Sequence, residues 1–267
     1  MTGATGFLGN ELLKQINHDH FKVTVCGRNT NKLENLSKTY KRIKVINGDL
    51  SNAEDFHKIF KKNFDHVYHL AGYKYVNLSE TKVSESINAN LITTLNLFQS
   101  CILNNIKAGI SLVSSDKTAN VKGVYSATKF LNDRLVSEYI DKGLEINILK
   151  LSNIFTSPGS VGEIWKENIL KNQPIKVSNP KSTRFFSTKE DVINSLLNKN
   201  IKLKVKSLEM DVLIKSLIFK YNKSYNLNNI QLIGLKTYEN LHEFSKNIKC
   251  SSEDYQKYSM QELFNYV

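Results

Sequence analysis

A group of polar residues between positions 114 and 129 has the types and the spacing of an acid–base catalytic site. Tyr125 and Lys129 are one helical turn apart, which places both side chains on one face of a helix. A lysine charge beside a tyrosine lowers the pKa of the phenol, so that the tyrosine can act as a base near neutral pH. Ser114 and Ser115 end the preceding apolar run. We therefore predict a serine–tyrosine–lysine set, Ser115, Tyr125 and Lys129, that takes a proton from a hydroxyl group.

An adjacent acid and base, Asp116 and Lys117, follow the two serines. Such a pair suits the elimination of water, because one group protonates a leaving hydroxyl while the other removes a proton from carbon. A solvated ion pair in a loop is the alternative interpretation of these two residues.

The chain begins with a pattern typical of a phosphate-binding loop, "MTGATGFLGN". Gly3 permits a tight turn, Gly6 lets the backbone approach a pyrophosphate, and Gly9 lets the following helix pack on a sheet. The amino terminus of that helix supplies N–H groups and the positive end of a dipole. We expect a dinucleotide cofactor to contact Gly3, Thr5, Gly6, Phe7, Leu8 and Gly9.

The residues at the ends of the expected strands indicate which dinucleotide binds. A carboxylate after the second strand would bind the ribose 2′-hydroxyl of NAD. Arg28 stands there instead and would pair with a 2′-phosphate, so NADP is favoured over NAD. An ordinary exposed arginine is the alternative. Asp49 could bind the adenine amine or only cap the next helix. The other cofactor positions expected at strand ends are Asn29, Leu50, Leu70, Ala71 and Ser114.

Apolar runs alternate with helical patterns through the first 151 residues. The expected strands are 21–26, 43–46, 66–70, 109–113 and 144–151, and the expected helices are 8–17, 52–61, 82–104 and 126–142. This alternation is typical of an α/β fold with a doubly wound parallel sheet. We expect a Rossmann domain over 1–151 and a smaller substrate-binding lobe over 152–267, with 185–197 returning to the first domain.

Only Met1 precedes the phosphate loop, although a strand is expected there. In the doubly wound order this first strand lies at the centre of the sheet, and its apolar residues would contribute on the order of 10 kcal/mol. We therefore expect the first strand to be missing and to leave unpaired backbone groups on both neighbours. We also expect Met1 to be an internal methionine of a longer natural protein.

The composition excludes several classes of protein. The net charge is +12, but the lysines are spread along the chain, so we expect a phosphate-bearing ligand rather than nucleic acid. No apolar run has the length of a membrane span and no secretory leader is present, so we expect a cytoplasmic protein. The three cysteines and six histidines have no metal-ligand spacing. We expect reduced thiols and no metal.

The chain resembles the extended short-chain dehydrogenase/reductases, and within them the inverting UDP-N-acetylglucosamine 4,6-dehydratases of polysaccharide biosynthesis. "VSSDKTANVKGVYSATK" matches the most specific block of that family, and the similarity extends from Thr2 to about His242. "HLAGYKYVNLSE", "INANLITTLN", "LSNIFTSPGSV", "NPKSTRFFSTKEDV" and "IGLKTYENLHE" are similar to further blocks. The resemblance implies that Lys74, Asn90 and Ile154 contact the cofactor and that Lys74, Asn153, Arg184 and Lys236 contact a UDP-sugar.

Several positions depart from the family pattern. Lys236 stands where an arginine is usual, and Ser126, Thr93 and Ser152 stand where glycines are usual. The Asp116, Lys117, Tyr125 and Lys129 set is retained. The departures therefore affect the identity of the sugar more than the type of reaction.

The resemblance also implies a mechanism with an internal redox cycle. Tyr125 takes the proton of the sugar C4 hydroxyl as C4 loses a hydride, Lys117 removes the C5 proton, Asp116 protonates the departing C6 hydroxyl, and the hydride returns to C6. A nucleotide-sugar 4-epimerase or 4-reductase would use Tyr125 and Lys129 without the Asp116–Lys117 pair. A non-catalytic NADP-binding scaffold is a further alternative. We expect a homo-oligomer.

Overall fold

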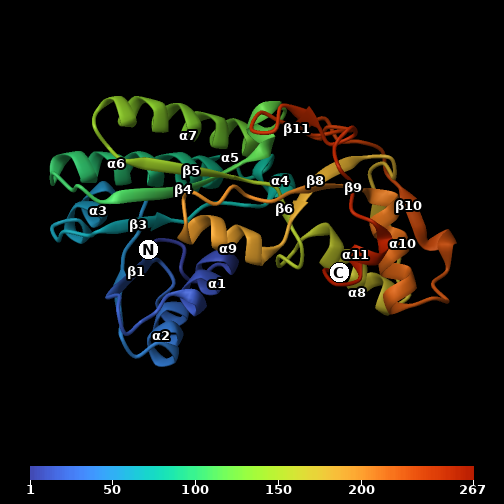
Figure 1. Ribbon diagram of the computed structural model, residues 1–267, viewed down its shortest axis with the longest axis horizontal. Coiled ribbons are helices and arrows are strands. Elements are labelled where there is room, and N and C mark those ends of the chain that lie inside the picture. The colour runs from blue at the N-terminus through green and yellow to red at the C-terminus, as the bar shows by residue number, and fades with distance from the viewer. The chain divides into compact units, whose positions relative to one another are not determined.

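The computed structural model describes all residues from 1 to 267 and divides the chain into two units (Figure 1). The first unit contains residues 1–118 and 123–150, and the second contains residues 119–122 and 151–267.

The first unit contains parallel strands that alternate with helices. β1 (Val23–Gly27) pairs in parallel with β2 (Ile43–Asn47), and β3 (His66–His69), β4 (Gly109–Ser115) and β5 (Ile146–Leu151) form a second run of neighbouring strands in that order. Ile110 to Ser115 of β4 are all buried, as is usual for a parallel strand covered on both faces. The prediction of an α/β fold with parallel strands and helices in alternation is confirmed.

Met1 and Thr2 occupy part of the central position that the sequence predicts to be empty. Thr2 forms parallel bridges with β1 and with β3. Its N–H donates to the carbonyl oxygen of Tyr68 at 2.9 Å, and the N–H of Cys26 donates to the carbonyl oxygen of Met1 at 3.0 Å. The expectation that the position of the first strand is vacant is therefore wrong at the carboxyl end of that position. There, Met1 and Thr2 supply backbone hydrogen-bonding groups to β1 and β3.

In the first unit, six of the following seven helical segments overlap a predicted helix, and the one at residues 76–79 was not predicted. The seven segments are α1 (Phe7–Gln15), α3 (Ala53–Ile59), α4 (Val76–Ser79), α5 (Val83–Ile87), the π-helical η1 (Asn88–Ile92), α6 (Thr93–Leu103) and α7 (Val124–Asp141). A short 3₁₀ turn, η2 (Asp116–Ala119), follows β4. The hydrophobic core between these elements includes Phe56, Leu97, Phe98, Ile110 and Leu112.

Helix α2 (Thr30–Thr39) was not predicted from the sequence. Its ten residues are mostly polar, and only Leu33 and Leu36 are buried. The helix begins after Asn29, whose side chain accepts a hydrogen bond from the N–H of Lys32 at 2.9 Å. The capping residue and two buried leucines three residues apart therefore define a helix that lacks a longer apolar stripe.

The second unit combines three small groups of strands with four α-helices. β6 (Asn153–Ile154) is parallel to β8 (Thr183–Ser187), which is antiparallel to β9 (Lys206–Glu209). β7 (Ile175–Val177) pairs with β10 (Ile230–Leu232), and β11 (Phe244–Ser245) with β12 (Cys250–Ser251). The helices are α8 (Val161–Leu170), α9 (Lys189–Leu197), α10 (Met210–Tyr221) and α11 (Met260–Leu263), with a 3₁₀ turn, η3 (Leu227–Asn229). Residues 185–197, in β8 and α9, belong to this unit.

The core of the second unit forms around a tryptophan. Trp165 is buried with Ile169, Leu208 and Leu213, and its indole N–H donates to the carbonyl oxygen of Lys176 at 3.1 Å. The single polar atom of this large side chain is thus satisfied inside the core. No helix of the chain combines the length and the apolar character that crossing a membrane requires.

Candidate active site

The phosphate loop is packed so closely that side chains are excluded at two of its glycines. Gly3 has φ +68°, and a Cβ atom there would lie 2.5 Å from the backbone nitrogen of Ala71. A Cβ atom on Gly9 would lie 2.3 Å from the carbonyl oxygen of Gly3. Glycine alone tolerates both conditions. The loop therefore lies directly against the end of β3, and α1 begins at Phe7 with its first N–H groups unused within the helix.

A buried histidine, which the sequence did not assign to the site, supports this loop. His69 Nδ1 lies 2.8 Å from Thr2 Oγ1, and His69 Nε2 lies 3.3 Å from Thr94 Oγ1. The hydroxyl of Thr2 also accepts from the N–H of Ala71 at 3.2 Å. Burial lowers the pKa of His69 to about 3, with a smaller contribution from the charge of Lys129. The imidazole is therefore neutral, and it joins the phosphate loop to α6.

We expect His69 to make the protein sensitive to acid. Its pKa is about 3 in the folded protein and 6.5 in the unfolded chain, so the unfolded chain binds more protons between these pH values. The stability that the neutral imidazole contributes is complete above pH 6.5 and is lost as the pH falls toward 3. The loss amounts to at most about 5 kcal/mol.

Urea unfolding of the wild type and of His69→Gln at a series of pH values measures this contribution. The variant should lose less stability than the wild type between neutral and acidic pH. His20→Gln, at an exposed histidine, is the matched control and should keep the wild-type slope. Equal slopes for the wild type and His69→Gln would show that His69 is not the responsible group.

The residues at the ends of β1 and β2 are close enough to interact electrostatically. Arg28 is exposed just after β1. Burial raises the pKa of Asp49, but hydrogen bonds from Ser51 and the charge of Arg28 outweigh this effect and hold the pKa below its ordinary value. Asp49 Oδ1 accepts from the N–H and the hydroxyl of Ser51, at 3.0 and 2.8 Å. This carboxylate therefore closes the turn before α3, but it does not cap the helix, because the side chain of Asn52 accepts from the N–H of Glu54 and caps α3.

Asn90, on the π-helical turn, holds the loop that carries Lys74. Its Oδ1 accepts from the N–H of Tyr73 at 2.8 Å, and its Nδ2 donates to the carbonyl oxygen of Tyr73 at 3.2 Å. A Cβ atom on Gly72 would lie 2.9 Å from Asn90 Oδ1 and 3.3 Å from Lys129 Nζ. The buried Asn90 amide thus positions the loop after β3 and brings it beside Lys129. Short π-helical segments are frequent at functional sites.

Tyr125 and Lys129 lie on α7 as the spacing predicts. The helix starts at Val124, where the hydroxyl of Ser126 accepts from the N–H of Gly123 at 3.1 Å and donates to its carbonyl oxygen at 2.9 Å. Ser126 therefore caps its own helix. Tyr125 is half-buried, and Lys129 is buried with its Nζ 3.4 Å from the carbonyl oxygen of Val113. Burial lowers the pKa of Lys129 to about 8, partly opposed by the charge of Asp133.

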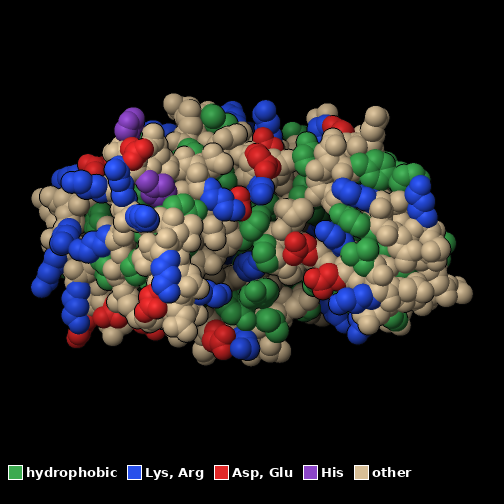
Figure 2. Space-filling view, turned by 90° about the horizontal axis from the view of Figure 1, so that it is seen from below, with side chains coloured by type: hydrophobic (Ala, Val, Ile, Leu, Met, Phe, Trp, Pro, Cys, Tyr) green, Lys and Arg blue, Asp and Glu red, His purple; other side chains and the backbone are tan.

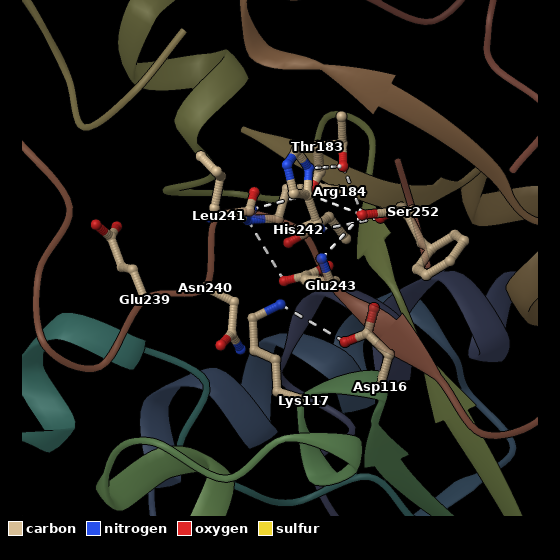
Figure 3. Close-up of polar contacts among 12 residues, drawn as sticks. Asp116, Lys117, Thr183, Arg184, Glu239, Asn240, Leu241, His242, Glu243 and Ser252 are labelled. Carbon is tan, nitrogen blue, oxygen red and sulfur yellow. Dashed lines mark hydrogen bonds and ion pairs between the residues drawn. The ribbon is translucent and has the colours of Figure 1, made fainter. Parts of the chain in front are cut away.

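Asp116 and Lys117 form an ion pair that is largely removed from solvent. Lys117 Nζ lies 3.6 Å from Asp116 Oδ1, and the two side chains are 22% and 6% exposed (Figure 3). The hydroxyl of Ser115 donates to Asp116 Oδ1 at 3.3 Å and accepts from the N–H of Lys117 at 3.3 Å. The low exposure of the two side chains argues against the alternative interpretation, which is a solvated ion pair in a loop. The arrangement places an acid, a base and a hydroxyl together where β4 ends.

Arg184, in the second unit, is enclosed by the segment around residue 242. Its Nη1 donates to the carbonyl oxygens of Thr183 and Leu241 at 2.8 and 2.9 Å, and its Nε lies 3.5 Å from Glu243 Oε1. Thr183 Oγ1 also lies 2.8 Å from His242 Nδ1, as Figure 3 shows. These contacts fix the orientation of the guanidinium group, which has five N–H donors in all.

The remaining residues predicted in the second unit have varied surroundings. Asn153 uses its amide inside the sheet, where Nδ2 donates to the carbonyl oxygen of Phe185 at 2.9 Å. Ile154 lines a mainly apolar hollow together with Phe155, Phe186 and Leu217. The N–H of Lys236 donates to Glu239 Oε2 at 2.9 Å, while Lys236 itself is exposed. Asn153 and Ile154 are adjacent in β6, and Lys236 lies in the segment after β10.

Charged side chains are mixed on the surface. Figure 2 shows Lys and Arg side chains interspersed with Asp and Glu over the face in view, without a continuous basic tract. The excess of positive charge is thus spread out on this face, as the even distribution of lysines in the sequence suggests.

The parallel α/β unit, its glycine loop and the Tyr125–Lys129 helix together define an extended short-chain dehydrogenase/reductase. The chain belongs to the polysaccharide biosynthesis protein family, whose model matches residues 1–265. The resemblance stated from the sequence is therefore confirmed at the level of the family.

Individual relatives are distant. An inverting UDP-N-acetylglucosamine 4,6-dehydratase of Campylobacter jejuni is 26% identical over 271 residues, which cover 95% of this chain and 77% of that protein. A protein of Methanocaldococcus jannaschii described as an uncharacterized membrane protein is 27% identical over 91% of this chain and 78% of its own length. A UDP-glucose 4-epimerase of Rickettsia canadensis is 25% identical over 74% of this chain and 60% of its own length.

Two further comparisons concern length and fold. The chain spans only 33% of the matching polysaccharide biosynthesis proteins of Bacillus subtilis and Staphylococcus aureus. The X-ray structure of Pen from Bacillus thuringiensis superposes with a TM-score of 0.86 at 23% identity, covering 99% of this chain and 94% of that one. At this identity the superposition shows a shared fold.

Proposed function

We propose that this protein is an NADP-dependent nucleotide-sugar 4,6-dehydratase that acts on UDP-N-acetylglucosamine. The observation that carries the proposal is the Asp116–Lys117 pair, which is largely removed from solvent and begins just after β4, three residues beyond the Val113 carbonyl that accepts from Lys129. Two sets of proton-transfer groups, one for a hydroxyl and one for a carbon acid, are thus attached to the same strand end. The name of the Campylobacter relative agrees with this chemistry.

The residues at the amino terminus fit a dinucleotide. Two features suit the binding of a pyrophosphate. The backbone packs too closely at Gly3 and Gly9 for a Cβ atom, and the first N–H groups of α1 are unused within the helix. Gly72, whose Cβ would lie 3.3 Å from Lys129 Nζ, leaves space beside the proposed catalytic lysine for a ribose. When bound, a nicotinamide ring accepts a hydride and gives it back.

The protein's own groups then move the protons. Tyr125 takes the proton of the C4 hydroxyl, and the adjacent Lys129 ammonium lowers the pKa of the phenol. Transfer of a proton from Lys117 to Asp116 within the pair gives a neutral amine and a carboxylic acid. Once C4 is a ketone, the C5 hydrogen is acidic and the amine of Lys117 removes it. Asp116 protonates the C6 hydroxyl as it leaves. Because Asp116 is buried and Lys117 is only partly exposed, few bulk water molecules can compete in these transfers.

In the second unit we propose that Arg184 and Lys236 bind the diphosphate and that Asn153 contributes to sugar binding. Arg184 is held by Thr183 and Glu243, so its remaining donors have a fixed direction, which suits planar recognition of phosphate oxygens.

A nucleotide-sugar 4-epimerase is the second candidate, favoured by the Rickettsia relative. Product mass separates the two reactions. Incubation of the NADP-loaded protein with UDP-N-acetylglucosamine, followed by mass spectrometry, should give a product one water lighter than the substrate. A product of unchanged mass supports the epimerase, and the absence of any turnover supports a non-catalytic NADP-binding scaffold.

The choice of NADP over NAD is tested at Arg28. Arg28→Asp should weaken NADP binding about tenfold or more while NAD binding changes much less, because a hydrogen bond to a charged group contributes about 1.5–3 kcal/mol. Calorimetric titration of each cofactor measures the two affinities. Lys38→Asp, an equal charge change at the other end of α2, is the control. If both cofactors are weakened equally, Arg28 does not bind a 2′-phosphate.

A further inference from the structure

A carboxylate on α7 connects three elements of the proposed site. Asp133 follows Lys129 by one helical turn and is 15% exposed. Its Oδ1 accepts from the hydroxyl of Ser114 at 2.6 Å, and its Oδ2 lies 3.0 Å from Lys150 Nζ at the end of β5. Asp133 therefore joins α7 to the carboxyl ends of both β4 and β5.

Lys150 extends these contacts to the turn that carries the acid–base pair. Its Nζ donates to Thr118 Oγ1 at 3.3 Å, and the hydroxyl of Thr118 donates to the carbonyl oxygen of Ser115 at 2.9 Å. Thr118 is buried at the end of the same 3₁₀ turn as Asp116 and Lys117. The chain of contacts from Asp133 through Lys150 and Thr118 thus reaches both sides of the Asp116–Lys117 segment.

Three titratable groups contact or influence Lys129 or its neighbour Asp133. Asp133 lies on its own helix and raises the pKa of the ammonium, while burial lowers it. His69, on β3, is neutral, and Lys150, on β5, has its charge paired with Asp133. Removal of the Asp133 charge would leave Lys129 without its compensating carboxylate and Lys150 without its partner.

We propose that Asp133 is a positioning residue that fixes the Asp116–Lys117 turn relative to the Tyr125–Lys129 face of α7. Two proton-transfer sets that act on adjacent carbons of one sugar must keep a constant separation, and misplacement by about 1 Å can cost on the order of 100-fold in rate. Asp133 is the group that contacts α7, β4 and β5 together. This inference rests on the proposed function for its kinetic consequence, but its structural consequence is independent of the substrate.

The first test uses the full chain without substrate. Hydrogen exchange followed by mass spectrometry should show faster exchange at residues 115–118 in Asp133→Asn than in the wild type. Lys150→Met, which removes the contacts with Asp133 and Thr118 but leaves the hydrogen bond between Ser114 and Asp133, should increase exchange in the same segment. Asp133→Glu should restore part of the protection, and Asp141→Asn, an exposed charge change on the same helix, should have no effect.

The second test is kinetic. In Asp133→Asn, kcat for water loss from UDP-N-acetylglucosamine should fall by about 10- to 100-fold with little change in KM. The pH at which kcat falls on the alkaline side should decrease. The carboxylate of Asp133 raises the pKa of Lys129, so its removal lets the ammonium lose its proton at lower pH. A purely structural role would change stability without moving the pH profile.

The outcomes separate the two proposals. Unchanged exchange at 115–118 in both Asp133→Asn and Lys150→Met overturns the positioning role, and so does an unchanged pH profile in an active enzyme. If the wild type yields no dehydrated product, the proposed function fails, and the exchange measurement still decides the role of Asp133.

Discussion

Tyr125→Phe is expected to abolish turnover, with kcat lower by about 10²- to 10⁴-fold. The phenol oxygen is the group that takes the proton of the C4 hydroxyl, and every later step requires the C4 ketone. Lys129 is fixed beneath the loop after β3 and retains its charge in the variant, so the cofactor should still bind. Single-turnover measurement of nicotinamide reduction, with UDP-N-acetylglucosamine as substrate, follows this first step directly.

Tyr139→Phe is the matched control for this variant. Tyr139 lies on the same helix but is buried in the core, 5.1 Å from the ring of Phe98. Removal of its hydroxyl should leave turnover near the wild-type rate. Turnover by Tyr125→Phe at the wild-type rate would show that another group takes the proton.

Lys117→Gln is expected to stop water loss while nicotinamide binding and reduction remain. The amine removes the C5 proton, and glutamine has no group that can replace it. Loss of a general base lowers the rate by about 10²- to 10⁴-fold. Stopped-flow absorbance of the reduced cofactor and product mass, measured together, show whether the reaction halts after the first oxidation.

The control for this variant is Lys107→Gln, at an exposed lysine before β4. It should behave as the wild type. Two results would contradict the role of Lys117: water loss at the wild-type rate, or loss of both the oxidation and the elimination. The second result would mean that Lys117 serves binding or folding and not the C5 proton transfer.

The strands and the motif helices could be predicted because their signals are local. β4 is a buried parallel strand, so its apolar run appears directly in the sequence. Tyr125 and Lys129 are placed by a four-residue spacing, and Gly3 and Gly9 by a loop pattern. Helix α2 escaped prediction because its apolar stripe consists of two leucines in a polar segment.

Contacts between distant segments could not be predicted. Thr2 pairs with both β1 and β3, but the segment before the glycine loop contains only two residues and is too short to show a strand pattern. His69 has the same appearance in the sequence as any histidine at a strand end, and only its burial between Thr2 and Thr94 shows its function in the loop. Arg184 is oriented by Leu241 and Glu243, whose separation along the chain gives no signal of contact.

The incorporation of solvent deuterium into the product tests the central claim most directly. The wild-type protein, loaded with NADP, is incubated with UDP-N-acetylglucosamine in deuterated water, and the product is analysed by mass spectrometry and NMR. Because Lys117 removes the C5 proton and C5 is protonated again from solvent, the account predicts a product that has lost one water and carries one carbon-bound deuterium, at C5. A product of unchanged mass without carbon-bound deuterium would contradict the account and assign epimerisation to this site.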